Sequence, residues 1–174
     1  IGVPKTIDND LPHTDHCPGF GSVIKFNAAI AMEVGADVGS MATGDGSCCI
    51  IEVMGRSAGW IAAGTVLAKR SPSDPPHIIL VPEVAYRKEA FVAKVKATVA
   101  DYGYCIVVAG EGIKDDQGLE VAADTSRLDA FGHPLLSGVG EVLADTVQDA
   151  LGFKSRSLKL GYAQRASAHF ASET

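Results

Sequence analysis

Short apolar runs alternate with amphipathic segments along most of the chain. The apolar runs are rich in β-branched residues, and Gly or Pro follows each of them, which predicts short strands. The predicted strands span residues 48–54, 77–81, 104–109 and 157–160. Strands that alternate with helical segments are typical of α/β domains. We therefore expect an α/β fold with a mostly parallel sheet and helices on both of its faces.

The segments between the predicted strands have the spacing of amphipathic helices. Ser22 fits the N-cap of a helix over residues 23–34 that Gly35 ends, and Ser57 fits the N-cap of a helix over 58–69. Residues 88–102 and 139–147 repeat apolar side chains on one helical face, which predicts two helices packed on the sheet. The polar segment 114–119 contains a Gly and predicts a surface loop.

Composition and charge exclude several classes of protein. The 174 residues include 15 Lys and Arg against 21 Asp and Glu, a net charge of −6, without a cluster of basic residues that would bind nucleic acid. The longest apolar runs, such as 105–109, are far shorter than the roughly 20 residues of a membrane span. The four cysteines form no CxxC motif, and adjacent Cys48 and Cys49 point to opposite faces of a strand. We therefore expect free thiols and a reducing, cytoplasmic location.

The chain begins with Ile1-Gly2-Val3-Pro4 and contains neither an initiator Met nor a signal peptide at this end. We therefore expect the chain to be a piece of a longer protein.

The strongest local candidate for chemistry is the segment 4–10, which reads PKTIDND. If this segment is extended, Thr6, Asp8 and Asp10 lie on one face, and each carboxylate raises the pKa of the other. Such a group can deprotonate an alcohol, with the charge of Lys5 opposing the rise in pKa. The alternative is an Asp- and Asn-rich turn with a solvated Lys.

Further candidates follow the predicted strands, at the sheet edge where ligands bind in open α/β folds. After the first strand, Gly55 lets a ligand approach the backbone and Arg56 offers a planar fork for a phosphate or carboxylate. Glu111 lies between two glycines and can accept hydrogen bonds from sugar hydroxyls. Tyr162 and Arg165 can hold a phosphate. Each of these residues alone is equally compatible with an ordinary turn or an exposed charge.

Three other features favour structural roles. The glycine-rich segment 43–47 leads from a helix into a strand, the reverse of a phosphate-binding loop, and predicts a turn. His13, Asp15, His16 and Cys17 lack a second cluster with zinc-finger spacing, so we expect solvated loop residues and no metal site. Cys105 lies in an apolar strand and is expected to be a buried small residue.

Three motifs together resemble the phosphofructokinase family: PKTIDND at 4–10, EVMGR at 52–56 and LGYAQR at 160–165. They occur in that family's order and spacing and span nearly the whole chain. The resemblance implies a phosphofructokinase-like sugar-phosphate domain that transfers a phosphoryl group to the 1-hydroxyl of fructose 6-phosphate. The product is fructose 1,6-bisphosphate, the step belongs to glycolysis, and the cofactor is Mg²⁺.

The resemblance also implies roles for individual residues. Asp8 matches the general base, and Thr6 and Asp10 match its neighbours at the transferring phosphoryl group, with Asp10 contacting Mg²⁺ through water. The matches to the sugar-phosphate site are Met54, Gly55, Arg56, Glu111 and Arg165. Arg156 matches an arginine that family members lend across a subunit interface, so we expect a homodimer or homotetramer of the full-length protein.

Two residues bear on the identity of the phosphoryl donor. Lys5 stands where ATP-dependent bacterial members usually have Gly, and Tyr162 stands where they commonly have His. Both residues favour pyrophosphate as the phosphoryl donor. For Lys5, the reason is that a cation at this position suits a pyrophosphate donor. ATP remains the alternative, because some ATP-dependent members also carry this Lys.

The chain departs from the family pattern in three ways. A second interfacial arginine is replaced by Ser47, Ala166-Ser167 follow Arg165 in place of two glycines, and the glycine-rich donor loop that precedes PKTIDND is absent from the sequence. We therefore expect residues 1–19 and 164–174 to be edges of a donor domain, with 20–163 forming the fructose 6-phosphate domain. The piece alone is expected to be inactive. These departures also leave a non-catalytic, sugar-phosphate-binding regulatory subunit as a further alternative.

Overall fold

The centre of the molecule is a four-stranded sheet in which every pair of neighbouring strands is parallel. The computed structural model describes residues 1–42, 44–128, 134–136 and 138–167. The strand order is β2-β3-β1-β6, formed by β1 (Ser47–Val53), β2 (Ile78–Leu80), β3 (Tyr104–Gly110) and β6 (Lys154–Lys159). All four predicted strands are therefore present. Strand β6 begins three residues earlier than predicted, because its first half is exposed and lacks the apolar signal of a buried strand.

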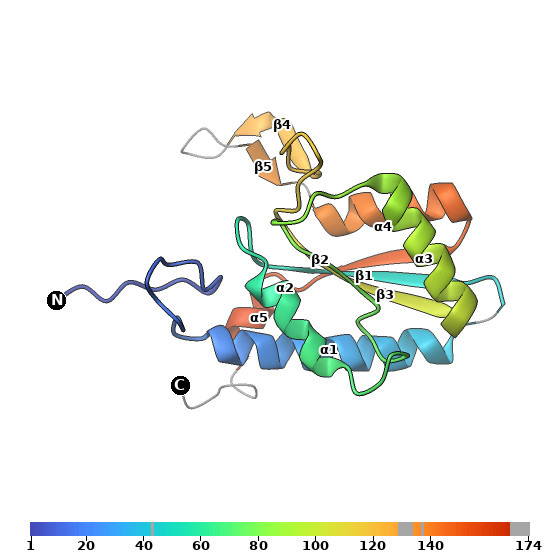
Figure 1. Cartoon of the computed structure of the whole chain (residues 1–174), viewed down its shortest axis with the longest axis horizontal. Helices are drawn as coiled ribbons and strands as arrows, with labels where there is room; N and C mark the ends of the chain where they lie inside the picture. Colours follow the sequence, from blue (N-terminus) through green and yellow to red (C-terminus); the bar gives the residue numbers. More distant parts are fainter. Residues whose placement is uncertain (43, 129–133, 137, 168–174) are drawn as a thin grey trace.

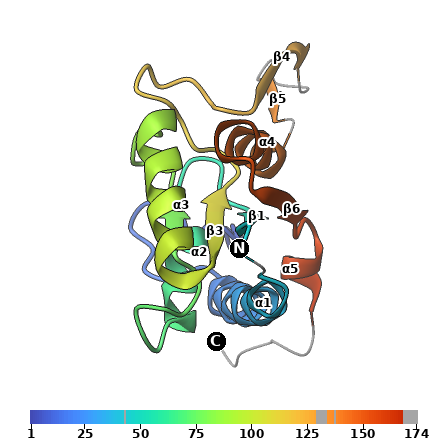
Figure 2. The same cartoon turned by 90° about the vertical axis from the view of Figure 1, so that its right-hand side faces the viewer.

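Helices cover both faces of this sheet, as predicted (Figures 1 and 2). The long helix α1 (Phe20–Ser40), the short α2 (Trp60–Gly64) and the 3₁₀ helix η1 (Thr65–Ala68) pack on one face. Helices α3 (Lys88–Tyr102) and α4 (Val139–Leu151) pack on the other. A short helix α5 (Ala163–Ala166) follows β6. The hairpin of β4 (Ala123–Leu128) and β5 (Pro134–Leu136), which the pattern did not predict, stands apart from the sheet (Figure 1).

Alternate residues of the central strands feed two separate cores. Cys48 and Ile50 pack with α3 and α4, whereas Cys49 and Ile51 pack with α1 and α2. Strand β1 is buried at six consecutive positions because helices cover both of its faces. All four cysteines are free and buried, and adjacent Cys48 and Cys49 lie on opposite faces as expected.

Helix α1 differs from its prediction at both ends. It begins at Phe20 after Gly19, whose φ of 86° needs a glycine, and not at Ser22. It also continues through Gly35 to Ser40. A Cβ atom at residue 35 would overlap the Pro75 ring. Gly35 therefore serves close packing inside the helix and does not end it.

The predicted N-cap at Ser57 is also wrong. Helix α2 begins at Trp60, and the backbone N–H of Gly59 donates to the Glu83 carboxylate at 2.8 Å. A carboxylate from a distant loop thus performs the capping that the local pattern assigned to Ser57. Helix α3 has its predicted bounds, and α4 extends four residues beyond its prediction to Leu151.

The polar segment 114–119 is a turn on the surface, as predicted. The Asp115 carboxylate accepts hydrogen bonds from the backbone N–H groups of Gln117 and Leu119, each at 2.9 Å. Residues 44–45 also form a turn before β1, while Thr43 of that predicted turn lies outside the described residues. Within the described ranges, no helix has the length and apolar character needed to cross a membrane. The predicted boundaries at residues 19 and 163 stay predictions.

Candidate active site

Asp8 lies in a tight turn and not in an extended segment. Its backbone N–H donates to the Thr6 hydroxyl at 3.2 Å, and the following Asn9 has a left-handed φ of 57°. The extended conformation, in which Thr6, Asp8 and Asp10 share one face, is therefore wrong, and the alternative of an Asp- and Asn-rich turn is confirmed. The left-handed residue breaks the two-residue alternation of side chains, which leaves Asp8 half-buried and Asp10 exposed.

Asn9 organises the loop that follows this turn. Its side chain is 8% exposed, accepts a hydrogen bond from Cys17 N at 2.8 Å and donates to the Asp15 carbonyl oxygen at 3.3 Å. His16 Nε2 accepts a hydrogen bond from Gly21 N at the start of α1. Among the described residues, no group of three His, Cys, Asp or Glu side chains could hold a metal ion. His13, Asp15 and His16 are exposed, as expected, whereas Cys17 is fully buried, so the expectation of a solvated residue is wrong at this position.

The turn places Asp8 close to Arg56, in the loop after β1, and to Arg165. Burial raises the pKa of the Asp8 carboxyl above its usual value, and the charge of Asp10 adds to this rise. A hydrogen bond from the Arg56 backbone and the charge of Arg165 act in the opposite direction. Asp8 is therefore a stronger proton acceptor than a solvated aspartate, and it lies beside two of the predicted binding residues.

The loop of Met54, Gly55 and Arg56 leaves the carboxyl end of β1. Gly55 has a φ of 125°, and a Cβ atom there would lie 2.5 Å from the Ala58 carbonyl oxygen. Gly112, after β3, lies directly against the Arg56 backbone, and a Cβ atom at Gly112 would overlap the Arg56 carbonyl oxygen. The loop is thus held in place by contacts that only glycines permit.

Gly112→Ala tests this close contact. We expect the added methyl group to push the Arg56 backbone away and to lower the free energy of unfolding by about 1–3 kcal/mol. Chemical denaturation of the full-length protein measures this change. Gly44→Ala is a control for replacement of a glycine in general, because nothing lies within 4 Å of a Cβ atom at Gly44 and its φ is not left-handed. Equal losses of stability in the two variants would contradict the proposed contact.

The Arg56 guanidinium binds a carboxylate of the same chain. Its Nε lies 3.2 Å from Glu120 Oε1, and one terminal nitrogen lies 3.3 Å from Glu120 Oε2. The planar fork that was predicted to hold a phosphate is thus engaged in a two-point ion pair. An anionic ligand that reaches Arg56 has to share or displace Glu120.

A cavity of about 380 Å³ opens at the carboxyl ends of β1, β3 and β6. It is lined by Glu52, Val53, Met54, Glu111, Lys159, Gly161, Tyr162 and Gln164. Burial raises the pKa of Glu111, the negative charges of Asp8 and Glu52 raise it further, and a backbone hydrogen bond from Gly55 and the charge of Lys159 oppose the rise. The structure thus brings Met54, Glu111 and Tyr162 into one cavity, with Asp8 close enough to repel Glu111.

Gln164 supports this cavity, although its motif did not reveal that role. Its side chain is 4% exposed, and its Oε1 accepts hydrogen bonds from Met54 N at 3.3 Å and from Asn27 Nδ2 at 3.1 Å. Its Nε2 donates to the Gly161 carbonyl oxygen at 3.0 Å. One buried amide therefore joins α1, the loop after β1 and the end of β6. Asn27, 137 residues away in sequence, carried no recognisable signal.

Arg165 lies at the border of a neighbouring cavity of about 270 Å³, together with Ile7, Gly19 and Phe26. Its guanidinium carbon is 4.7 Å from the centre of the exposed Tyr162 ring, a cation–π contact. Gln164 lines both cavities. Arg165 and Tyr162 are therefore adjacent, as their predicted joint role requires.

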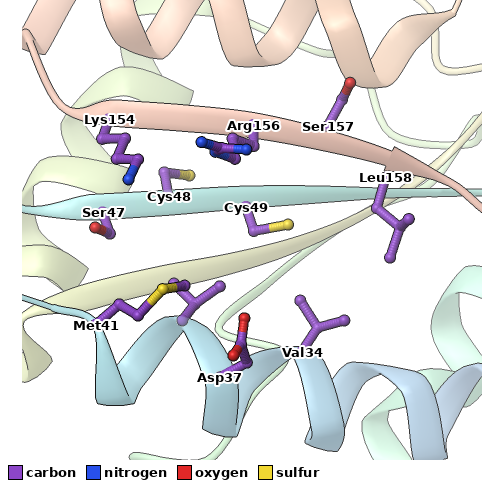
Figure 3. Close-up of a pocket in the computed structure, with 11 residues that line it drawn as sticks. Val34, Asp37, Met41, Ser47, Cys48, Cys49, Lys154, Arg156, Ser157 and Leu158 are labelled. Carbon is purple, nitrogen blue, oxygen red and sulfur yellow. The ribbon is translucent and has the colours of Figure 1, made fainter.

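Arg156 lies in a third cavity, of about 360 Å³, between α1 and the amino-terminal halves of β1 and β6 (Figure 3). Lys154, Asp37 and Cys49 line the same cavity, which shares no lining residue with the one around Glu111. Burial raises the pKa of the Cys49 thiol to about 11, so the thiol is protonated at neutral pH. The structure therefore separates Arg156 from the other predicted binding residues, and its role toward a neighbouring subunit stays a prediction.

The chain is similar to several known proteins over nearly its whole length. The model of the family described as Phosphofructokinase matches residues 1–173. The chain is 49% identical to the pyrophosphate–fructose 6-phosphate 1-phosphotransferase of Xanthomonas campestris and 44% identical to that of Halomonas elongata, in each case over all of its 174 residues. A solved pyrophosphate-dependent phosphofructokinase from Marinobacter aquaeolei matches 99% of the chain with a TM-score of 0.83 and 45% identity.

The chain covers only part of each of these proteins. It spans 42% of the Xanthomonas protein, 41% of the Halomonas protein and 39% of the Marinobacter chain. The similarity therefore concerns the part of each relative that aligns with residues 1–174.

Proposed function

This chain belongs to the phosphofructokinase family, and we propose that its full-length protein is a phosphotransferase that transfers a phosphoryl group from pyrophosphate to the 1-hydroxyl of fructose 6-phosphate. The product is fructose 1,6-bisphosphate, and the reaction is a step of glycolysis in the cytoplasm. One observation carries the proposal. The half-buried Asp8 lies close to Glu111, which lines the cavity at one edge of the sheet.

Each group at this edge has a chemical task in the proposed reaction. Asp8 accepts the proton of the attacking hydroxyl, and its raised pKa makes it a better base than a solvated aspartate. Glu111 accepts hydrogen bonds from sugar hydroxyls, while Arg165 binds the 6-phosphate beside Tyr162. Thr6 keeps the Asp8 turn in place through its hydroxyl. The backbone of Met54, fixed by Gln164, lines the sugar site.

Two observations support pyrophosphate as the donor. Lys5 is exposed at the start of the catalytic segment, where its charge can meet the phosphates of a donor. The relatives with 44–49% identity are also named for pyrophosphate. ATP is the alternative donor that the first experiment has to test.

We further propose Mg²⁺ as the cofactor. Mg²⁺ is usually held by one or two carboxylates together with substrate phosphates, and not by a complete protein cage. The exposed Asp10 fits this description, and it would contact the ion through water. Mg²⁺ would neutralise charge on the donor phosphates. We also propose a homodimer or homotetramer, in which the separate position of Arg156 suits a contribution to a neighbouring subunit.

The direct test is the initial rate of fructose 1,6-bisphosphate formation by the full-length protein with Mg²⁺ and either pyrophosphate or ATP. We expect turnover with pyrophosphate and none with ATP. Turnover with ATP alone would assign the other donor. Binding of fructose 6-phosphate without turnover under either condition would instead support the regulatory-subunit alternative.

A further inference from the structure

Lys159 and Glu52 form a charge pair in the wall of the cavity around Glu111. Their positions face each other in the β1–β6 register, and Lys159 Nζ lies 2.8 Å from Glu52 Oε1. The other oxygen, Glu52 Oε2, accepts a hydrogen bond from Gly140 N in the first turn of α4, also at 2.8 Å. Glu52 is thus fixed at both oxygens, and it holds the Lys159 ammonium at the end of β6.

The Glu52 carboxylate is 4% exposed, whereas the Lys159 side chain is 55% exposed and also lines the cavity. The backbone N–H groups at the start of α4 and the Lys159 ammonium together compensate the buried negative charge. The exposed part of Lys159 remains accessible from the cavity. The pair therefore combines a fixed anchor with a cation that faces the site.

Acidic groups surround this cation on several elements. Glu52 belongs to β1, Glu111 follows β3, and Glu141 lies in the first turn of α4. Among the described residues that line the cavity, Lys159 carries the one positively charged side chain. Without it, Glu52 and Glu111 would face the same cavity with no positive side chain in its wall.

We propose that Lys159 is a positioning residue for the sugar-binding carboxylate. Its ammonium, anchored on Glu52, supplies the positive charge that lets Glu111 accept hydrogen bonds from sugar hydroxyls as a carboxylate. The inference rests on the proposed function, since it requires a sugar phosphate in the cavity. It adds a residue pair, Glu52 and Lys159, that lies outside the sugar-phosphate residues named above.

The direction of the effect follows from the charges around Glu111. Burial and the charges of Asp8 and Glu52 raise the pKa of Glu111, and a backbone hydrogen bond from Gly55 together with the charge of Lys159 opposes this rise. When Lys159 loses its charge, Glu111 takes up a proton at higher pH and ceases to be a full acceptor. As the pH is lowered, a variant without the Lys159 charge should therefore lose its affinity for fructose 6-phosphate at a higher pH than the wild-type protein does. When Glu52 loses its charge, the repulsion of Glu111 falls. The loss of affinity for fructose 6-phosphate should then occur at a lower pH than in the wild-type protein.

The experiment measures the dissociation constant of fructose 6-phosphate for the full-length protein by calorimetry from pH 5 to 9, without a phosphoryl donor. We expect Lys159→Gln to raise the midpoint of the acid-side loss of affinity, and Lys159→Arg to keep the wild-type midpoint. Glu52→Gln should lower the midpoint. The phosphate of the substrate also titrates near pH 6, but it does so equally for every variant.

Lys96→Gln is the matched control. Lys96 is exposed on α3, away from the cavity, and its replacement by Gln removes the same positive charge. An unchanged midpoint in Lys159→Gln, or an equal shift in Lys159→Arg, would overturn the inference while leaving the proposed function intact. If Lys159→Gln does not fold, Lys159→Met in the same titration decides, because Met also removes the positive charge and keeps an unbranched side chain. A wild-type protein that does not bind fructose 6-phosphate would overturn both proposals.

Discussion

Asp8→Asn is expected to lower the kcat of the full-length protein by about 10²–10⁴-fold, the usual contribution of a general base. Asn keeps the size of the side chain but cannot accept the proton of the attacking hydroxyl. The turn around residue 8 should persist, because its hydrogen bond uses the Asp8 backbone N–H and the Thr6 hydroxyl. The dissociation constant of fructose 6-phosphate should therefore change by a few-fold at most.

Two measurements check this expectation: steady-state turnover with saturating substrates, and calorimetric titration with fructose 6-phosphate alone. Asp15→Asn is the matched control, because Asp15 is an exposed carboxylate of the same amino-terminal segment whose side chain takes no part in the loop's hydrogen bond to Asn9. Near-normal turnover of Asp8→Asn would remove Asp8 from the role of base. A regulatory subunit would show no turnover even in the wild-type protein.

Lys5→Met is expected to lower pyrophosphate-dependent turnover by about 10²–10³-fold, as loss of one fixed donor to a transition-state charge does in other enzymes. Phosphoryl transfer depends mainly on positioning and charge neutralisation, so the absence of one cation near the donor affects the transition state directly. Lys5 is exposed and makes no ion pair with another described residue, so its loss should not affect folding.

Initial rates with pyrophosphate and with ATP, measured side by side, test this role. Lys25→Met is the control, because Lys25 is an exposed lysine on α1 and Met removes the same charge. If ATP alone supports turnover and Lys5→Met is nearly unchanged, Lys5 does not act on the donor. If pyrophosphate alone supports turnover and the variant loses it, Lys5 acts at the donor.

The sheet could be predicted from sequence because its strands are buried on both faces. Strand β1 therefore reads as a continuous apolar run, and helix α3 shows the periodicity of a helix with one buried face. The start of α2 could not be predicted, because Glu83 caps it from a loop 24 residues away. The turn at Asp8 was one of two alternatives for a different reason: the same residues fit both an extended strand and a turn, and in the structure the Thr6 hydroxyl accepts the hydrogen bond of the turn.

Much of the candidate site depends on contacts between distant residues. Glu52 and Lys159 become neighbours only through the register of β1 and β6, and Glu120 reaches Arg56 across 64 residues. The motifs identified residues with recognisable local patterns, such as Asp8 and Glu111. Their partners lie outside any short motif, so only the folded chain reveals them.

The loop after β1 is joined to four other parts of the molecule. Gln164 holds Met54, Gly112 packs on the Arg56 backbone, Glu120 binds the Arg56 side chain, and Asp8 accepts a hydrogen bond from the Arg56 backbone. A ligand that enters the cavity therefore meets a preorganised wall. Its binding should cost little conformational entropy in this loop. Within the described residues, the exposed residues 1–5 are less constrained than this loop, so they are better suited to a closing movement over the ligand.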